Sequence, residues 1–302
     1  MSQPDHTLKH TLTLAAGAIC ISFAPIFLKF ALAEGMGPTN SAFWRLLIGG
    51  LVFLGLALAL GGSLKVTARL TWGLIAGMVF ACDLFVWHKS VAYIGAGMAT
   101  ILGNMQVFPT SILGRYLYKE KLSTVFKIAV PLAVVGVILL TGVGSDIEFT
   151  PRYLWGVALG LMTAVFYAGY IISLKNSSRD KQGAVRKMSQ RETMTLLGWI
   201  SLTSAALLAG ATAIEGQTFV PTTPQAWAHL AAVALVAQVA GWLLIYKSLS
   251  HLPASRSALI LLLQPTFATI WGAIFFDETL GLLQLFGAAL TLSAIYLGGA
   301  RR

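Results

Sequence analysis

Asp83 is the side chain with the clearest capacity for chemistry, since it is an acid inside a long apolar run. If that run crosses a lipid bilayer, a charge there costs at least about 2.5–3.5 kcal/mol. It must then face water, pair with a cation such as Lys29 or Lys89, or be protonated. Trp87 follows one helical turn later and points to the same side, with His88 beside it. An aromatic wall next to a carboxylate suits a cationic or zwitterionic ligand, so Asp83 is a candidate for binding a substrate amine or for coupling to protons.

A second set of polar and aromatic residues lies in other apolar runs. Gln238, Trp242 and Tyr246 are spaced by four residues, so we expect a helix to place them on one face. A glutamine buried in lipid needs a hydrogen-bond partner, and this face therefore turns either to a cavity or to a neighbouring helix. The same two interpretations apply to Asn104, Gln106, Phe166, Tyr167, Tyr170 and Gln264. Lys29 is a candidate for binding a carboxylate, or it extends to the membrane interface, as does Arg45 near the start of its run.

Motifs for several other chemistries are missing from the sequence. No Gly-x-x-x-x-Gly-Lys-Ser/Thr phosphate loop occurs, which excludes an ATPase within this chain. Neither a His-Glu-x-x-His pair nor a cluster of Cys and His occurs, so we expect no metal and no cofactor. Cys20 and Cys82 each lie in an apolar run and are interpreted as buried thiols. A Gly-x-Ser-x-Gly nucleophile turn is also missing, and we predict that the protein is not an enzyme.

The composition requires most of the surface to face lipid. Of 302 residues, 57% are hydrophobic and 11% are charged, whereas a soluble domain has about 25% charged residues. A bilayer core is crossed by about 20 apolar residues in a helix, which satisfies its own backbone hydrogen bonds. We therefore predict an all-α integral membrane protein with ten transmembrane helices. The expected spans are 11–33, 41–61, 70–92, 96–117, 122–143, 153–174, 192–213, 227–248, 255–276 and 281–299.

The distribution of charge predicts the orientation of these spans. The net charge is +10. With the N-terminus inside, every Lys and Arg lies toward the inner ends except Lys29, Arg45, Lys89 and Arg152. Cytoplasmic loops of membrane proteins carry such an excess, so we predict cytoplasmic N- and C-termini in the inner (plasma) membrane. We interpret the basic loop at 175–191 as an anchor to anionic lipid and expect no nucleic-acid partner.

The two halves of the sequence repeat each other. Residues 87–140 align with 245–298 without a gap. The matched pairs include Lys89 with Lys247, Gln106 with Gln264, Glu120 with Glu278 and, earlier in each half, Lys29 with Lys175 and Arg45 with Arg191. The second half has extra length around 210–226. Each half holds five spans, an odd number, so residues 11–143 and 144–299 should form two repeats of inverted orientation, an arrangement that permits alternating access.

The motifs and their order resemble the EamA-type carriers of the drug/metabolite transporter superfamily. The first half reads Trp87-His88-Lys89-Ser90-Val91-Ala92-Tyr93 and Tyr118-Lys119-Glu120-Lys121-Leu122, and the second reads Tyr246-Lys247-Ser248-Leu249, Gln264-Pro265 and Phe275-Phe276-Asp277-Glu278-Thr279-Leu280. Phe43-Trp44-Arg45 also resembles the family, whereas Pro109 stands two residues later than its counterpart Pro265. The resemblance implies a carrier with cytoplasmic termini and a cavity lined mainly by spans 1, 3, 4, 6, 8 and 9. Members handle amino acids, sugars, nucleotide derivatives, quaternary amines and other metabolites, often as exporters.

We therefore predict a secondary-active carrier that exports a small polar metabolite, with amino acids or related zwitterions as the first candidates. Its energy source is either the substrate gradient or the proton gradient, with Asp83 as the coupling candidate. One alternative is an exporter of cationic, aromatic drug-like compounds or quaternary amines. Another is an integral membrane enzyme acting on lipid-linked substrates, and a third is a membrane scaffold. The expected partners are the small-molecule substrate and the lipid bilayer, with the oligomeric state left open.

Overall fold

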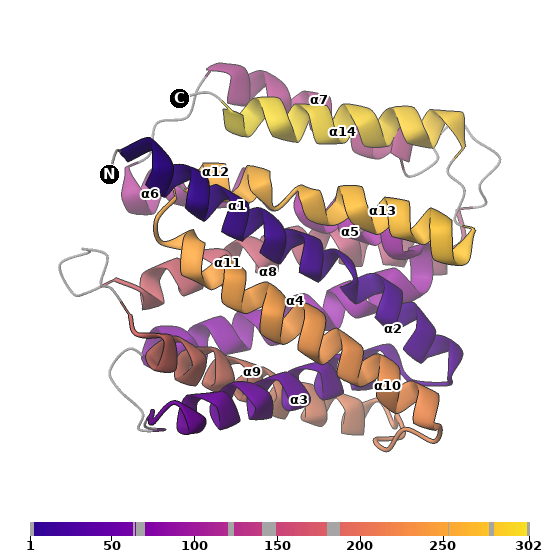
Figure 1. Cartoon of the computed structure of the whole chain (residues 1–302). Coiled ribbons are helices and arrows are strands. Elements are labelled where there is room, and N and C mark those ends of the chain that lie inside the picture. Colours follow the sequence, from indigo (N-terminus) through magenta and orange to yellow (C-terminus); the bar gives the residue numbers. More distant parts are fainter. Residues whose placement is uncertain are drawn as a thin grey trace.

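The computed structural model describes residues 3–62, 64, 70–119, 124–140, 149–179, 188–252, 254–277 and 281–300. All regular elements in these ranges are helices (Figure 1). The first half contains α1 (Gln3–Ser22), α2 (Ala24–Ala33), α3 (Pro38–Ala59), α4 (Leu70–Ile94), α5 (Ala96–Asn104), α6 (Val107–Tyr118) and α7 (Thr124–Leu140). The second half contains α8 (Pro151–Ser177), α9 (Gln190–Ile214), α10 (Pro224–Ala232), the π-helix η1 (Val233–Gly241), α11 (Trp242–Leu249), α12 (Ala254–Ile260), α13 (Leu263–Phe276) and α14 (Leu282–Ala300).

Six helical segments in the described ranges are long and apolar enough to cross a bilayer. They are Leu8–Ala33, Pro38–Ala59, Thr71–Ile94, Pro151–Ser177, Gln190–Ile214 and Pro224–Leu249. Lys127–Leu140, Leu263–Phe276 and Leu282–Ala294 are shorter apolar helices. The protein is therefore a multi-pass, all-helical membrane protein. The number of full crossings stays a prediction, because the expected fourth and ninth spans are each broken in two.

Prolines account for these breaks. A proline removes the hydrogen bond to the carbonyl four residues earlier and clashes with that carbonyl. Pro109 acts in this way on Met105, where α5 gives way to α6, and Pro265 acts on Leu261, where α12 gives way to α13. Pro25 likewise lies just after the interruption between α1 and α2. The prediction of continuous helices over 96–117 and 255–276 is therefore corrected.

The helices run side by side in alternating directions, with α7 and α14 at one edge and α3 and α9 at the opposite edge (Figure 1). Contacts between the halves come in matched sets. The packing of α4 against α8 corresponds to that of α11 and η1 against α1, and the packing of α5 and α6 against α8 corresponds to that of α12 and α13 against α1. Exchanging each helix for its counterpart in the other half thus reproduces the arrangement. Lys119 and Asp277, which are matched in the sequence repeat, both end their helices in the left-handed conformation.

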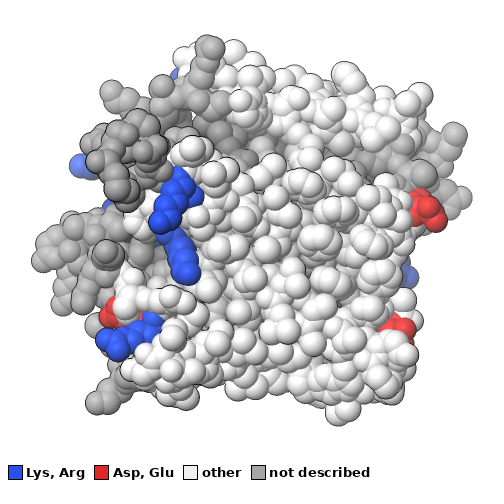
Figure 2. All heavy atoms as spheres, viewed as in Figure 1, with Lys and Arg blue, Asp and Glu red and all other residues white. Residues whose placement is uncertain are grey.

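The surface agrees with a lipid environment. The middle of the face in Figure 2 carries no charged side chain, and charges lie toward its two ends. Large apolar side chains are exposed on α7 and α14, including Ile128 and Phe286. Cys82 is exposed on α4 and Cys20 is half-buried, so the prediction that both thiols are buried is wrong for Cys82. Lipid offers a thiol the same apolar surroundings as a protein core.

The basic residues are unequally distributed between the two ends of the helices. The end at which α1 begins carries Lys9, Arg115, Lys119, Lys127, Lys175, Arg179, Arg191 and Lys247, by their positions in the helices. The opposite end carries Lys29, Lys89 and Arg152. α1 begins and α14 ends on the same side in Figure 1. After the orientation predicted from the sequence, we call the first end the inner end and the second the outer end.

Candidate binding site

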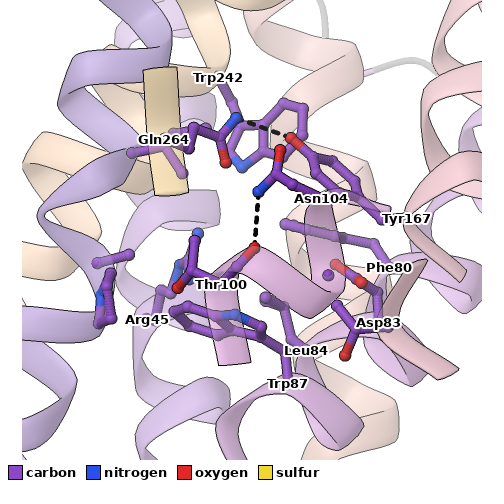
Figure 3. Close-up of a pocket in the computed structure, with 15 residues that line it drawn as sticks. Arg45, Phe80, Asp83, Leu84, Trp87, Thr100, Asn104, Tyr167, Trp242 and Gln264 are labelled. Atoms are coloured by element: carbon purple, nitrogen blue, oxygen red, sulfur yellow. Dashed lines mark hydrogen bonds between the residues drawn. The ribbon is translucent and has the colours of Figure 1, made fainter. Parts of the chain in front are cut away.

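A small cavity lies where both halves meet (Figure 3), with a volume of about 50 Å³. It is lined by Ile21, Ala24, Pro25, Arg45, Phe80, Asp83, Leu84, Trp87, Thr100, Gly103, Asn104, Thr163, Tyr167, Trp242 and Gln264. These residues come from α1, α2, α3, α4, α5, α8, α11 and α13. The expected lining by spans 1, 3, 4, 6, 8 and 9 is thus found, with the second span added through α3. The volume suits a few water molecules in this conformation.

Two opposite charges face this cavity. Asp83 on α4 is 5% exposed and Arg45 on α3 is 2% exposed. The Asp83 Oδ1 and Arg45 Nε atoms have no hydrogen-bond partner among the residues that the structure describes. In Figure 3 the two side chains lie on different sides of the cavity. Each side chain is therefore buried beside the cavity with one polar atom that makes no hydrogen bond within the described residues.

The position of Arg45 corrects an expectation from the sequence. We expected a second span from 41 and an arginine reaching the interface. α3 instead begins at Pro38, which occupies its first turn, so Arg45 lies two turns inside the helix and is buried. Proline in the first helical turn is a known start signal, and giving it more weight would have placed Arg45 deeper. Phe80, Thr100 and Thr163 were also not predicted, because neither their types nor their spacing separates them from packing residues.

Aromatic rings form one wall of the cavity. The ring of Trp242 contacts Tyr167 at a centroid distance of 6.1 Å, Tyr170 at 4.7 Å and Phe80 at 5.3 Å. Phe80 and Tyr170 are stacked at 4.0 Å, which places Tyr170 behind this wall and outside the cavity lining. Trp87 is a further large ring of the lining and lies across the cavity from Trp242 (Figure 3). The aromatic wall, defined as Phe80, Tyr167 and Trp242, offers an apolar surface and ring faces to a ligand.

Amide side chains mark the breaks in two helices beside the cavity. Gln264, at the start of α13, donates a hydrogen bond to the hydroxyl oxygen of Tyr167 at 2.9 Å. Asn104, at the end of α5, donates to the carbonyl of Thr100 at 2.9 Å, and both bonds are drawn in Figure 3. Asn104 Oδ1 and Trp242 Nε1 are buried with no partner in the described ranges. Broken helices that end at a central site supply oriented backbone groups to a ligand.

Six of the predicted binding residues line this cavity, namely Asp83, Trp87, Asn104, Tyr167, Trp242 and Gln264. The others, Lys29, His88, Tyr170, Gln238 and Tyr246, do not. His88 is buried, with Nδ1 2.8 Å from the carbonyl oxygen of Leu84 in its own helix. Lys29 places its ammonium group 4.1 Å from the centre of the Phe276 ring. Both side chains therefore lie outside the lining of this cavity.

Gln238 leaves the face of Trp242 for a physical reason. It lies in η1, a π-helix, whose turns hold more residues than α-turns. Residues four apart therefore do not stack, and the expected common face of Gln238 and Trp242 is corrected. Gln238 points to α9 and donates to Ser201 Oγ at 3.0 Å. Tyr246 lies nearer the inner end, where its hydroxyl donates to Met188 Sδ at 3.1 Å.

The alternative of a structural partner for Asp83 receives no support from Lys89. Lys89 forms an ion pair with Glu215, at the end of α9, and is also close to the ring of Phe85 at 4.3 Å. Asp83 therefore faces the cavity without the lysine of its own helix.

Comparison with known families matches residues 8–142, and again residues 154–298, to the EamA-like transporter family. The chain belongs to the EamA-like transporter family. Because two copies of one family unit fill nearly the whole chain, the internal repeat is a duplication of that unit. This EamA-family member is a transporter and not an enzyme, as the family and the names of its relatives agree.

Several relatives of this EamA-family protein are known by name. A probable amino-acid metabolite efflux pump of Salmonella typhimurium is 27% identical over 67% of this chain and 67% of its own length. Its namesake in Escherichia coli is 26% identical over 77% of each chain. An uncharacterized transporter of Bacillus subtilis is 22% identical over 92% of this chain and 88% of its own. A crystal structure covering 96% of this chain and 97% of its own, with a TM-score of 0.70 and 16% identity, shows a shared fold.

Proposed function

We propose that this protein is a secondary-active carrier that exports amino acids or related zwitterions. The observation that carries the proposal is a central cavity in which a buried carboxylate, Asp83, and a buried guanidinium, Arg45, face the same space. A compact ligand with both charges satisfies both groups, whereas a passive scaffold has no use for them. The names of the Salmonella typhimurium and Escherichia coli relatives are in keeping with this substrate class.

The proposed architecture has ten membrane crossings in two repeats, 11–143 and 144–299, with both termini in the cytoplasm. The excess of Lys and Arg at the inner end supports this orientation in the inner membrane. The mechanism is alternating access, in which one repeat rocks against the other around the cavity. Because the cavity holds about 50 Å³, it must widen when a substrate enters.

Substrate binding is assigned to Arg45 together with the predicted residues that line the cavity: Asp83, Trp87, Asn104, Tyr167, Trp242 and Gln264. Asp83 is also the proposed proton-coupling group, since it is the acidic side chain of the lining. During the transport cycle Asp83 would then carry a proton while the cavity is empty and would lose it when substrate binds.

The test uses purified protein in liposomes loaded with a labelled amino-acid mixture, with and without a pH gradient. We expect amino-acid efflux from the liposomes, and we expect a proton gradient directed into the liposomes to accelerate it. Asp83→Asn should abolish that acceleration. The matched control is Asp277→Asn, because Asp277 is exposed and lies at the outer end of α13. Unchanged pH-driven flux in Asp83→Asn would remove Asp83 from proton coupling, and no flux of any amino acid would reject the carrier.

Export of cationic aromatic compounds is the second candidate, favoured by the aromatic wall beside Asp83. Arg45 makes export of cations less favourable, because its buried guanidinium in the same cavity repels a cationic substrate. Fluorescence of Trp87 and Trp242 distinguishes the two: a shift with quaternary amines and none with amino acids would favour the cation exporter.

A further inference from the structure

We propose that Arg45 and Asp83 bind the two charged groups of a neutral α-amino acid. Arg45 binds the carboxylate, and Asp83 binds the ammonium group. The substrate side chain then lies against the aromatic wall. This inference rests on the proposed function and deepens it, since it assigns each charged group of the substrate to one side of the cavity.

The first step is that the two charges attract each other electrostatically but form no direct contact. A buried structural ion pair needs close contact and further hydrogen bonds to offset its desolvation. Arg45 and Asp83, both within the described ranges, form no ion pair with each other, and Figure 3 shows them apart. Asp83 Oδ1 and Arg45 Nε also lack a hydrogen-bond partner among the described residues. Both side chains are more than nine-tenths buried, so a ligand that bridges them supplies the missing partners.

The second step is the chemistry of each charge. A guanidinium presents a planar fork of N–H donors that matches the two oxygens of a carboxylate. A carboxylate accepts hydrogen bonds from an ammonium group, and the ring of Trp87, one turn after Asp83, lies on the same side of α4. An α-amino acid carries its two charges on neighbouring atoms, so it is compact enough to present both to one small cavity.

The third step concerns the substrate side chain. The remaining lining consists of the aromatic wall, small or apolar residues, and the neutral polar groups of Thr100, Asn104, Thr163 and Gln264. A third charge is missing from this lining, so an acidic or basic substrate side chain would be buried without a partner. Neutral amino acids with apolar or aromatic side chains therefore fit best.

The test compares three probes that differ only in their charged groups, in proteoliposomes: L-phenylalanine, phenethylamine without the carboxylate, and 3-phenylpropanoate without the amine. The wild-type protein should move phenylalanine at least about tenfold faster than the other two, because each analogue leaves one buried charge unpaired. Arg45→Gln should lower phenylalanine flux while phenethylamine flux is kept or rises. Asp83→Asn should do the reverse and favour 3-phenylpropanoate.

Matched controls come from the repeat and from the surface. Arg191, the sequence counterpart of Arg45, is exposed at the start of α9, and Asp277 is exposed after α13. Arg191→Gln and Asp277→Asn should keep the wild-type order of the three probes. Arg45→Lys keeps the charge without the fork, so it should keep the order and raise the KM for phenylalanine. If Arg45→Gln does not fold, the KM of Arg45→Lys for phenylalanine tests the role of Arg45 instead.

Two kinds of failure are distinguishable. If the wild-type protein moves amino acids but Arg45→Gln and Asp83→Asn lower all three probes equally, the two residues are structural and only this inference is overturned. The same holds if the probe order does not change in either variant. If the wild-type protein moves no amino acid, the proposed function is rejected and the inference is rejected with it.

Discussion

Two tyrosines beside the cavity differ in one hydrogen bond, and this difference predicts opposite effects of the same substitution. Tyr167 accepts a hydrogen bond from Gln264, whereas the buried hydroxyl of Tyr170 has no partner in the described part of the chain. Tyr167→Phe leaves the Gln264 amide unpaired and should lower the free energy of unfolding by about 1–3 kcal/mol. Tyr170→Phe removes an unpaired group and should be neutral or stabilising. Thermal unfolding of the two variants in detergent checks the order, and a larger loss for Tyr170→Phe would contradict it.

The same scale shows what the sequence could and could not predict about the cavity. Asp83 and Trp87 were found because an acid in an apolar run is costly, and helical spacing then brings the tryptophan to its side. Arg45 was missed because its depth depends on where α3 begins, and a shift of three residues separates the interface from the interior. Gln238 was misplaced because a π-helix changes the period on which face arguments rest.

Broken helices are the main feature at the scale of elements. Pro109 and Pro265 were visible in the sequence, yet apolar continuity favoured a single span in each half. When the two halves are aligned, the α5–α6 break lies two residues later than the α12–α13 break, and Pro109 lies two residues later than Pro265. This shared offset identifies the prolines as the cause of both breaks. The breaks place Asn104 and Gln264 at helix ends beside the cavity, so the irregularity of these elements positions the site.

The pair α7 and α14 depends on close backbone approach, which predicts a strong effect of one methyl group. A Cβ added at Gly287 would lie 2.9 Å from the Leu139 carbonyl carbon and nearer still to backbone atoms of Leu140 and Gly136. Gly287→Ala should therefore separate the helices and destabilise the protein by about 1–3 kcal/mol. Gly210→Ala in α9 is the control, since nothing lies within 4 Å, and it should be neutral or gain up to about 1 kcal/mol. Equal unfolding temperatures for the two variants would show that α7 and α14 tolerate a wider spacing.

At the scale of the whole molecule, duplication made the architecture predictable from the sequence. The alignment of 87–140 with 245–298 anticipates the matched contacts between halves and the left-handed residues Lys119 and Asp277. The alignment says nothing about the segment around 210–226, which has no counterpart in the first half. The structure of this segment could not be inferred from the repeat, because no part of the first half aligns with it.

That unmatched segment ties the halves together at the outer end. Glu215 pairs with Lys89 and accepts a hydrogen bond from Thr39 Oγ1 at 2.7 Å. Gln217 accepts from the backbone N–H of Asn40 at 3.0 Å. These bonds join the region after α9 to α3 and α4, which line the cavity through Arg45 and Asp83. We therefore expect them to break when the cavity opens at the outer end. Hydrogen bonds to charged groups contribute about 1.5–3 kcal/mol.

Glu215→Gln should therefore shift the protein toward opening at the outer end, because it weakens the pair with Lys89 while it keeps the shape of the side chain. The measurement places a cysteine at Thr163 in the cavity, in a chain with Cys20→Ser and Cys82→Ser. A membrane-impermeant maleimide applied at the outer side should label it at least about threefold faster than in the chain that keeps Glu215, since a weakening of about 0.7 kcal/mol corresponds to a factor of about three. Asp277→Asn, which removes an acid at the same end outside this network, should leave the labelling rate unchanged. If Glu215→Gln labels no faster than this control, the bonds of Glu215 support the fold without closing the cavity.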